Sequence, residues 1–383
     1  MALNITQGQK GTGQNSDSII RDVDDKVWFL NAETSPLISM LKKTKKNSKS
    51  CTSQKFEHYE KDQGTPILTV SGAIANGSTT NISLAAGEGT SVMKDDTIYV
   101  PSTGEQLIVT AVNIDTITVV RGYGEISGAA IADGANLVLL GNSAMQGTGA
   151  PEGKSLNSSN VYNYVEIQKD AVDITASEAG TNRYDEKNPK LVEKRGEVMT
   201  LHQEALERKF MFGQRKEDTS GKHVKYTTRG FINFIQTNVH DMGGTFSRTK
   251  VNQFLRDVFL YGKGDKIMFL GSELLDAFDA DIFTNASVNL TPASSSYGLD
   301  VVTWVSPYGS IKLAYHRVLS QIHPDWGLCI DLQKTKYRYL TGRNTHIKQN
   351  VQANDEDSFK DLIITEAGLQ LMNEKNHGIL KLG

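Results

Sequence analysis

The sequence has little of what secreted, zinc-binding and membrane-spanning proteins require. Its two cysteines, Cys51 and Cys329, lie far apart and in no metal-ligand spacing, which argues against a disulfide framework and a cysteine-based zinc site. No run of about 18 apolar residues occurs, and the polar N-terminal segment has no apolar stretch behind its charges, so neither a membrane helix nor a signal peptide is predicted. We therefore expect a soluble protein made in a reducing cytoplasm, without a membrane partner, metal or cofactor.

Neither sign of charge is in excess. The chain has 41 Lys and Arg residues against 44 Asp and Glu, a net charge of -3, which is too balanced for a general nucleic-acid binder. One local basic cluster contains Lys42, Lys43, Lys45, Lys46 and Lys49. Two interpretations stay open: the lysines complete the C-terminal end of a helix and stay solvated, or they contact phosphates or an acidic neighbouring subunit.

The motifs of common enzyme classes are also missing. Residues 148–155 (TGAPEGKS) come within one residue of a phosphate-binding loop, but Thr148 replaces its first glycine and a polar loop entering a strand follows where a helix is needed. His316, His323 and Asp325 could seat a metal, yet no further ligand is placed by spacing, and surface histidines are the simpler interpretation. The acidic run 355–357 is typical of a solvated loop. The sequence does not predict an enzyme.

Residues 92–140 form the most informative stretch. Apolar, β-branched clusters alternate there with turn-forming residues, a pattern typical of short antiparallel strands with a core of their own. The clusters are Ile98–Val100, Leu107–Val112, Ile117–Val120 and Leu137–Leu140. Alternating strands are predicted before and after this stretch, at Cys51–Lys61 and Val161–Ile174. One strand leads into the β module and another returns from it. This order indicates a long hairpin with the β module inserted at its tip.

The longest predicted helix follows. Asn188 as N-cap and Pro189 at the first turn begin it, and an apolar 3.6-residue period extends to about Gly213, a length on the order of 35 Å. Its expected apolar face contains Leu191, Val192, Val198, Met199, His202, Ala205, Leu206, Phe210 and Met211. The opposite face is charged and includes Arg195 and Glu197. Gly196 within the helix predicts that another backbone packs close to it.

The C-terminal half mixes helices and strands. A helix capped by Ser247 leads into a strand at Ile267–Leu270, and Ser272 caps a second, short helix. Further strands are predicted at 300–305, 311–315, 328–332, 336–340 and 362–365, followed by a C-terminal helix. The short spacings between 300 and 340 favour an α+β sheet with antiparallel pairs over a doubly wound parallel sheet.

In this order the elements resemble the major capsid protein of tailed bacteriophages, with the fold named after phage Hong Kong 97, and specifically the subgroup whose extended loop carries a β insertion. Each motif is short, and their order from about residue 20 to the end carries the resemblance. The resembling segments are 95–100 (DDTIYV), 104–105, 118–124 (TVVRGYG), 132–134, 152–153, 229–235 (RGFINFI), 266–270 (KIMFL), 363–370 (IITEAGLQ) and 376–378. The chain departs from the family pattern after Gly124, where Glu125–Gly128 replaces a Gly-Thr pair.

The resemblance implies an α+β phage capsid fold with a defined division of the chain. The expected parts are an N-terminal arm with short helices (1–49), an extended loop (50–175) with an all-β insertion (about 66–140), a peripheral domain (176–244) with a spine helix (about 188–213), an axial domain (245–331) and a return to the peripheral domain (332–383).

The same resemblance implies that many copies form hexamers and pentamers of an icosahedral shell around double-stranded DNA. The shell would be assembled in the host cytoplasm and become part of the virion, with DNA contacted nonspecifically. Portal and decoration proteins are further expected partners. The short arm before residue 20 leaves no room for a fused scaffolding segment, so a separate scaffold, or none, is expected. Alternatives are a tail or decoration protein, or a carbohydrate-binding structural module. Candidate subunit contacts are Lys42, Lys43, Lys45, Lys46, Glu57, Tyr59, Glu105, Arg121, Tyr123, Arg195 and Glu197.

Overall fold

The chain divides into two compact units in the computed structural model. Residues 61–159 form one unit, called the module below, and residues 1–60 with 160–383 form the other, called the body. The structure describes residues 36–43, 47–62, 64, 66–150, 153, 155–181, 190–262, 266–284, 291–296 and 299–383. The helix predicted at Ile20–Asn31 lies outside the described residues.

The module is a six-stranded antiparallel sheet with strand order β3-β8-β5-β6-β7-β4. The four apolar clusters of the sequence lie on or beside β5 to β8. Alternate β-branched side chains of these strands point inward and are buried, as in Val109, Ile117 and Val119. The strands are β3 Ile67–Thr69, β4 Asn81–Ser83, β5 Asp96–Tyr99, β6 Gln106–Asn113, β7 Thr116–Val120 and β8 Asn136–Asn142.

The body contains a seven-stranded mixed sheet with order β13-β22-β18-β14-β17-β16-β15. The antiparallel pairing predicted for residues 300–340 occurs between β16 and β17; β14 and β18 are also antiparallel, while β14 and β17 are parallel. The strands are β13 Val239–Asp241, β14 Lys266–Leu270, β15 Thr291–Ser296, β16 Leu299–Ser306, β17 Gly309–Tyr315, β18 Trp326–Asp331 and β22 Gly378–Lys381. The helices beside it are α5 Arg248–Phe259, α6 Ser272–Thr284 and α7 Arg317–Ile322.

Strand β14 is buried on both faces because it separates two cores. Its Ile267 and Phe269 pack in the core that contains α7 residues such as Leu319. Its Met268 and Leu270 pack in the core that contains the apolar stripes of α5 and α6. This alternation explains why the segment KIMFL is apolar throughout, since a strand covered on both faces needs no polar side.

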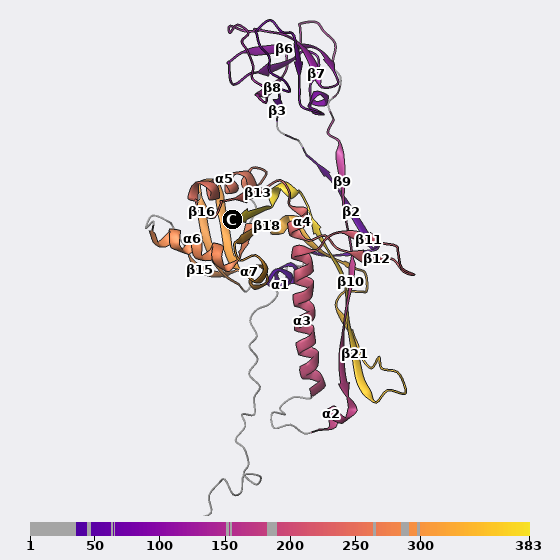
Figure 1. The fold of residues 1–383 in the computed structure, drawn as a ribbon. Helices are drawn as coiled ribbons and strands as arrows, with labels where there is room; N and C mark the ends of the chain where they lie inside the picture. The colour runs from indigo at the N-terminus through magenta and orange to yellow at the C-terminus, as the bar shows by residue number, and fades with distance from the viewer. Residues whose placement is uncertain are drawn as a thin grey trace, which may run out of the picture. The chain divides into compact units, whose positions relative to one another are not determined.

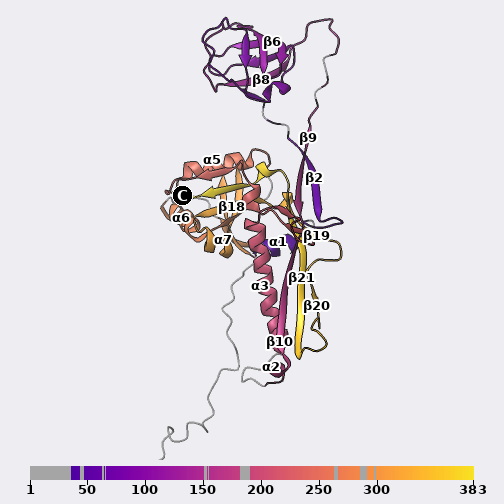
Figure 2. The ribbon, with the colours of Figure 1, turned by 45° about the vertical axis from the view of Figure 1, so that its right-hand side comes forward.

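A second sheet of the body has the order β1-β19-β21-β10, and β20 also pairs with β21. Figures 1 and 2 both show helix α3 lying along β10 and β21. The elements of this region are α1 Pro36–Lys43, β1 Ser48–Cys51, β10 Glu166–Thr175, α2 Ala176–Gly180, α3 Lys190–Phe212, α4 Phe231–Phe234, β19 Thr335–Leu340, β20 His346–Lys348 and β21 Ser358–Leu371. Asn188 and Pro189 lie outside the described residues.

Two predictions about strands and helices were wrong. The segment Val161–Ile174 is divided between two strands, because β9 (Ser158–Tyr164) pairs with β2 (Lys55–Lys61) and β10 pairs with β21. The expected C-terminal helix is also absent from the described chain. Its residues form the end of β21, a short 3-10 turn at Glu374–Asn376 and strand β22. Asn373 at φ 52° ends the long strand, and the buried β22 then returns into the seven-stranded sheet.

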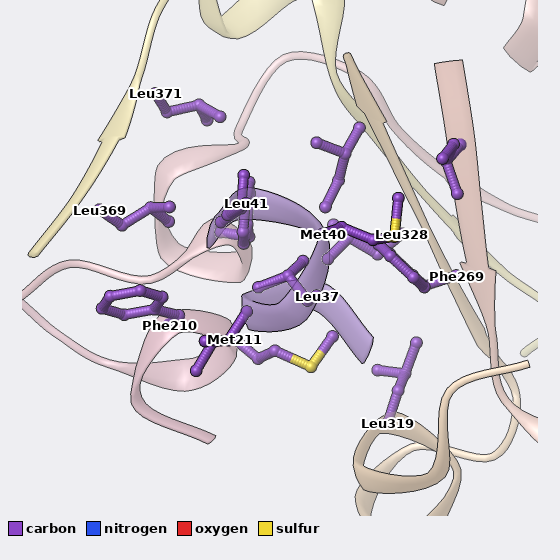
Figure 3. Packing of buried hydrophobic residues seen from close by; sticks show 14 of the residues in the cluster. Leu37, Met40, Leu41, Phe210, Met211, Phe269, Leu319, Leu328, Leu369 and Leu371 are labelled. Carbon is purple, nitrogen blue, oxygen red and sulfur yellow. The ribbon is translucent and has the colours of Figure 1, made fainter. Parts of the chain in front are cut away.

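Helix α1 fills the centre of the larger core of the body. Leu37, Met40 and Leu41 pack against Phe210 and Met211 of α3 (Figure 3). The rest of the core around α1 comes from β21, β14, α7 and β18, through Leu369, Leu371, Phe269, Leu319 and Leu328. An eight-residue helix is too short to be stable alone, so this packing is what forms it.

Candidate functional site

The ribbon of β2 and β9 presents two predicted contact residues. Tyr59 is 71 % exposed, and Glu57 is exposed beside Lys55, with their charged atoms 2.5 Å apart. Asn160 of β9 donates to the Glu57 carboxylate across the ribbon (2.8 Å). A two-stranded ribbon has only marginal stability alone. The exposed side chains of this ribbon, Tyr59 and Glu57, are therefore free to contact another protein surface.

Aromatic and charged side chains hold the root of the ribbon. Lys55 Nζ and the Arg215 guanidinium lie 4.4 and 3.8 Å from the ring centre of Tyr162, a pair of cation–π contacts. Next to it, the Glu217 carboxylate accepts hydrogen bonds from the hydroxyl groups of Tyr164 (3.0 Å) and Tyr226 (3.3 Å). Glu217 belongs to a small hairpin of β11 (Lys216–Asp218) and β12 (Lys225–Thr227). This hairpin supports the ribbon where it leaves the body.

Asn163 fixes the same strand to the core of the body. It is buried, donates from Nδ2 to the carbonyl of Leu369 (2.7 Å) and accepts the backbone N–H of Arg229 at Oδ1 (2.9 Å). Its amide also donates to the Thr228 hydroxyl (3.2 Å). The ribbon is thus anchored at Asn163 by bonds to two separate segments.

Glu105 and Arg121 do not face outward as expected. Glu105 is 0 % exposed and forms a bidentate ion pair with Arg121, both bonds being 2.7 Å. The backbone N–H groups of Gly122 and Ala129 also donate to its carboxylate. Burial would raise the pKa of Glu105, but these donors outweigh it and the pKa is lowered. The pair therefore organises the module internally, and its prediction as a subunit contact is corrected.

Arg121 also orders the loops around this pair. Its Nη1 donates to the carbonyl oxygens of Asn76 and Thr79. The two loops meet so closely that a Cβ on Gly77 would lie 2.0 Å from the carbonyl oxygen of Gly128. Tyr123 follows Gly122 in this region and is 49 % exposed, so its role as a subunit contact stays a prediction.

The basic cluster is only partly described. Lys45, Lys46 and the side chain of Lys43 lie outside the described residues. Lys42 is half-buried, with Nζ 5.4 Å from the ring centre of Tyr337, and burial lowers the pKa of its amine. Lys42 thus packs within its own chain.

A polar series that the sequence analysis missed links three elements of the body. His202 Nδ1 lies 2.5 Å from Asp170 Oδ2, and Nε2 lies 2.7 Å from Thr365 Oγ1. Thr365 Oγ1 donates to Thr345 Oγ1 (2.9 Å), which also accepts from Lys42 Nζ (3.4 Å). An acid, a histidine and a hydroxyl in this order activate a nucleophile only when the hydroxyl donates to the histidine, whereas Thr365 donates its hydrogen bond to Thr345. Thr365 is also 0 % exposed, so its hydroxyl has no access to a substrate and the series acts in packing.

A buried carboxylate joins α3 to α1 and α7. Glu207 on α3 is 0 % exposed and accepts the backbone N–H groups of Leu37 (3.0 Å) and Ile38 (3.1 Å) at the start of α1. His316 Nδ1 accepts the N–H of Leu319, so its Nε2 carries the proton that is donated to Glu207 (2.8 Å). The side chain of Glu207 is therefore the N-terminal cap of a helix about 170 residues earlier in the sequence. No local pattern predicts this contact.

The solvent-facing half of α3 differs from the prediction. Val192 is 53 % exposed although it was expected in the core, while Arg195 pairs with the buried Asp361 (2.6 Å). Glu197 is half-buried. No other part of the described chain comes within 4 Å of a Cβ built on Gly196, so the predicted close packing is absent within the body.

The alternative sites considered in the sequence find no support among the described residues. His316 is committed to Glu207, and His323 stacks on Trp326 with ring centres 3.9 Å apart. No group of three or more potential metal ligands occurs in the described ranges. Strand β9 follows residues 148–155 where a phosphate-binding loop would need a helix. None of the described helices is long and apolar enough to cross a membrane.

Comparison with known proteins places the chain among virus shell proteins. The family model described as "SU10 major capsid protein" matches residues 5–382. A major capsid protein of Pseudomonas phage PaMx41 is 24 % identical over 272 residues, which cover 68 % of this chain and 65 % of the relative. The matched region thus spans just under two thirds of that relative's length.

Solved structures share the fold. A chain of Mycobacterium phage Cain matches with a TM-score of 0.54 and 10 % identity, covering 98 % of this chain and 99 % of the other. The capsid of a native GTA particle matches with a TM-score of 0.51 and 7 % identity, covering 99 % and 100 %. These similarities extend over both the module and the body. The fold is accordingly the phage capsid fold that the order of the elements predicted.

Proposed function

Because the chain belongs to the SU10 major capsid protein family, we propose that its copies assemble into hexamers and pentamers of an icosahedral shell that encloses double-stranded DNA and forms part of the virion. The family is one of structural capsid proteins. The match of its model over residues 5–382 carries the proposal, since it includes both units of the chain. Portal, scaffold and decoration proteins are further proposed partners, and assembly in the host cytoplasm is proposed with them.

The domain division belongs to the same proposal. Residues 50–175 would be the extended loop, with the ribbon as its stalk and the module as its head. Helix α3 with β10 and β21 would be the peripheral domain, and residues 245–331 the axial domain. In support, the ribbon leaves the body at an anchored root and exposes Tyr59 beyond it, as expected of a segment that lies on another copy. Tyr59, Glu57 and Tyr123 are the proposed contacts that combine exposure with position on this loop.

Electron microscopy of the expressed chain tests the assembly. Spherical or angular shells are expected. Rings or tubes would instead favour the alternative of a tail component. Monomers would favour the alternative of a carbohydrate-binding module. In a second measurement, protease should cleave residues 50–175 faster in monomers than in shells, because assembly buries the loop. Equal cleavage rates in both states would contradict the role given to the loop.

A further inference from the structure

The basic residues of the body are concentrated in one short segment. Residues 208–229 contain seven Lys or Arg and two Asp or Glu, a net charge of +5. The rest of the body, without this segment, contains 30 Lys or Arg and 33 Asp or Glu, a net charge of -3. The near-neutral balance of the chain therefore conceals a local cationic region, and the hairpin of β11 and β12 lies at its centre.

The hairpin has one face that packs on the body and one that points away from it. Successive side chains of a strand alternate between two faces, and directly paired residues share a face. Glu217 and Tyr226 are directly paired, and the Glu217 carboxylate accepts a hydrogen bond from Tyr164, so their face packs on the root of the ribbon. Lys216 and Lys225 therefore lie on the other face, which points away from that root.

This outer face and the tip of the hairpin are cationic and exposed. Lys216, Lys222 and Lys225 are exposed, and none of them forms an ion pair with another residue that the structure describes. Asp218 shares the outer face, but its carboxylate accepts the backbone N–H (3.1 Å) and the hydroxyl (2.6 Å) of Ser220. Figure 1 shows the hairpin projecting from the body, so its three ammonium groups are open to a partner.

The arginines that flank the hairpin are committed within the body. Arg215 lies over the ring of Tyr162 and donates to the carbonyl oxygen of that residue (2.6 Å). Arg229 donates from Nε to the carbonyl oxygen of Asn233 (3.0 Å). Arginine recognises a carboxylate by two parallel hydrogen bonds, whereas lysine is a point charge that suits phosphates. The exposed cations of the hairpin are all lysines, which favours a polyphosphate over the acidic surface of another copy.

We propose that the outer face and the tip of this hairpin bind the phosphates of double-stranded DNA through Lys216, Lys222 and Lys225. The proposal rests on the proposed function for the identity of this DNA, which is the DNA packaged in the shell. A two-stranded ribbon fits the major groove, which is about 12 Å wide, and one phosphate charge per about 1.7 Å of axis offers contacts in every register. Lysines at phosphates read no bases, so the contact is independent of sequence.

Binding of a double-stranded DNA fragment to the unassembled full-length chain tests the hairpin. Fluorescence anisotropy gives the affinity at several salt concentrations from about 50 to 200 mM. The test variant carries Lys216→Gln, Lys222→Gln and Lys225→Gln. The control variant replaces three lysines that are exposed elsewhere on the body: Lys169→Gln, Lys194→Gln and Lys348→Gln. Both variants have the same net charge, and both should melt at the temperature of the unmodified chain because every change is at the surface.

Each lysine at a phosphate contributes about 0.9 to the slope of log affinity against log salt. The slope of the test variant should therefore be smaller by about 2.7, and its affinity at about 0.1 M salt lower on the order of 100-fold. The control variant should bind like the unmodified chain. Equal losses in both variants would overturn the proposal, because net charge alone would then explain them. Unchanged DNA binding by a test variant that no longer forms shells would overturn it too, and would assign the hairpin to an acidic surface of another copy.

DNA-filled particles extend the test to packaged DNA. Formaldehyde should link the DNA to the three hairpin lysines, as mapped by mass spectrometry of the linked peptides. Links confined to other lysines would overturn the assignment to packaged DNA. An unmodified chain that binds DNA through the hairpin but forms no shells would instead reject the proposed function, so the two failures are distinguishable.

Discussion

The module and the body build their cores from very different parts of the chain. All buried apolar residues of the module lie between Leu68 and Leu137, and neighbouring strands supply them in turn. The core around α1 combines Leu37 with residues as distant as Ile379. Local contacts are formed at a small cost in chain entropy, whereas distant ones are not. The core of the module is thus complete within one continuous segment, whereas the core of the body needs residues from both ends of the chain.

The largest expected effect is the loss of the buried cap on α1. Glu207→Ala leaves His316 Nε2 and the N–H groups of Leu37 and Ile38 without their acceptor. Each buried donor left without an acceptor costs about 1–3 kcal/mol, so the body should unfold at a much lower urea concentration. Tryptophan fluorescence reports it selectively, because all three tryptophans lie in the body. The half-buried Glu197→Ala on the same helix is the control, expected within about 0.5 kcal/mol.

Arg121→Ala should destabilise the module and leave the body unchanged, the opposite of Glu207→Ala. It leaves the buried Glu105 carboxylate without its partner, at a cost of about 3 kcal/mol to the module alone. Hydrogen exchange should then rise within residues 61–159 and stay unchanged in the body. The double variant with Glu105→Ala should recover part of the loss, since no uncompensated charge remains. A change in tryptophan fluorescence equal to that of Glu207→Ala would show that the two units are not independent.

Acid should destabilise the body before the module. Burial and the nearby Lys266 lower the pKa of His377 to about 3, and burial also lowers the pKa of His202. Both histidines bind protons more readily in the unfolded chain than in the folded body, so stability falls as the pH drops below about 6.5. For His377 the loss is about 2 kcal/mol at pH 5.

The module contains no histidine, because all eight lie outside residues 61–159. Urea titrations at pH 7.5 and 5, followed by tryptophan fluorescence for the body and hydrogen exchange for the module, separate the two responses. Equal losses in both units would contradict the role assigned to the buried histidines.

The smallest expected effect is a gain. Gly196→Ala should stabilise the body by about 0.5–1 kcal/mol, because nothing in the described chain approaches the added Cβ and alanine favours the helix. Gly213→Ala is the matched opposite, since its Cβ would lie 2.5 Å from the carbonyl oxygens of Lys209 and Thr228. Thermal melting of both variants measures the difference. A Gly196→Ala chain that melts higher but no longer assembles would show that a neighbouring copy packs there.

Local pattern predicted much more of the module than of the body. Strands β5 to β8 follow from alternating residues and turns that lie next to each other, as at Asn113 to Thr116, whereas the three-residue strands β3 and β4 were not predicted. The cap of α1 by Glu207 and the series from Asp170 to Thr365 join residues 170 and 195 positions apart, which no spacing rule relates. Glu105 and Arg121 were misplaced for a related reason. Charged residues beside turns are usually solvated, and only the folded loops show that both are enclosed.

Strand β22 lies inside the seven-stranded sheet, between β13 and β18. On the ribosome, the module has all its strands once Asn142 has emerged, but the sheet of the body waits for about 240 more residues, up to Lys381. At about 5–20 residues per second this delay is on the order of ten to fifty seconds. Once Asp331 has emerged, β13 and β18 both lack the strand that lies between them for about 50 more residues, or roughly 3–10 s. The nascent chain thus passes through a stage in which a finished module precedes an open, aggregation-prone body, and this is the stage at which a chaperone would be most effective.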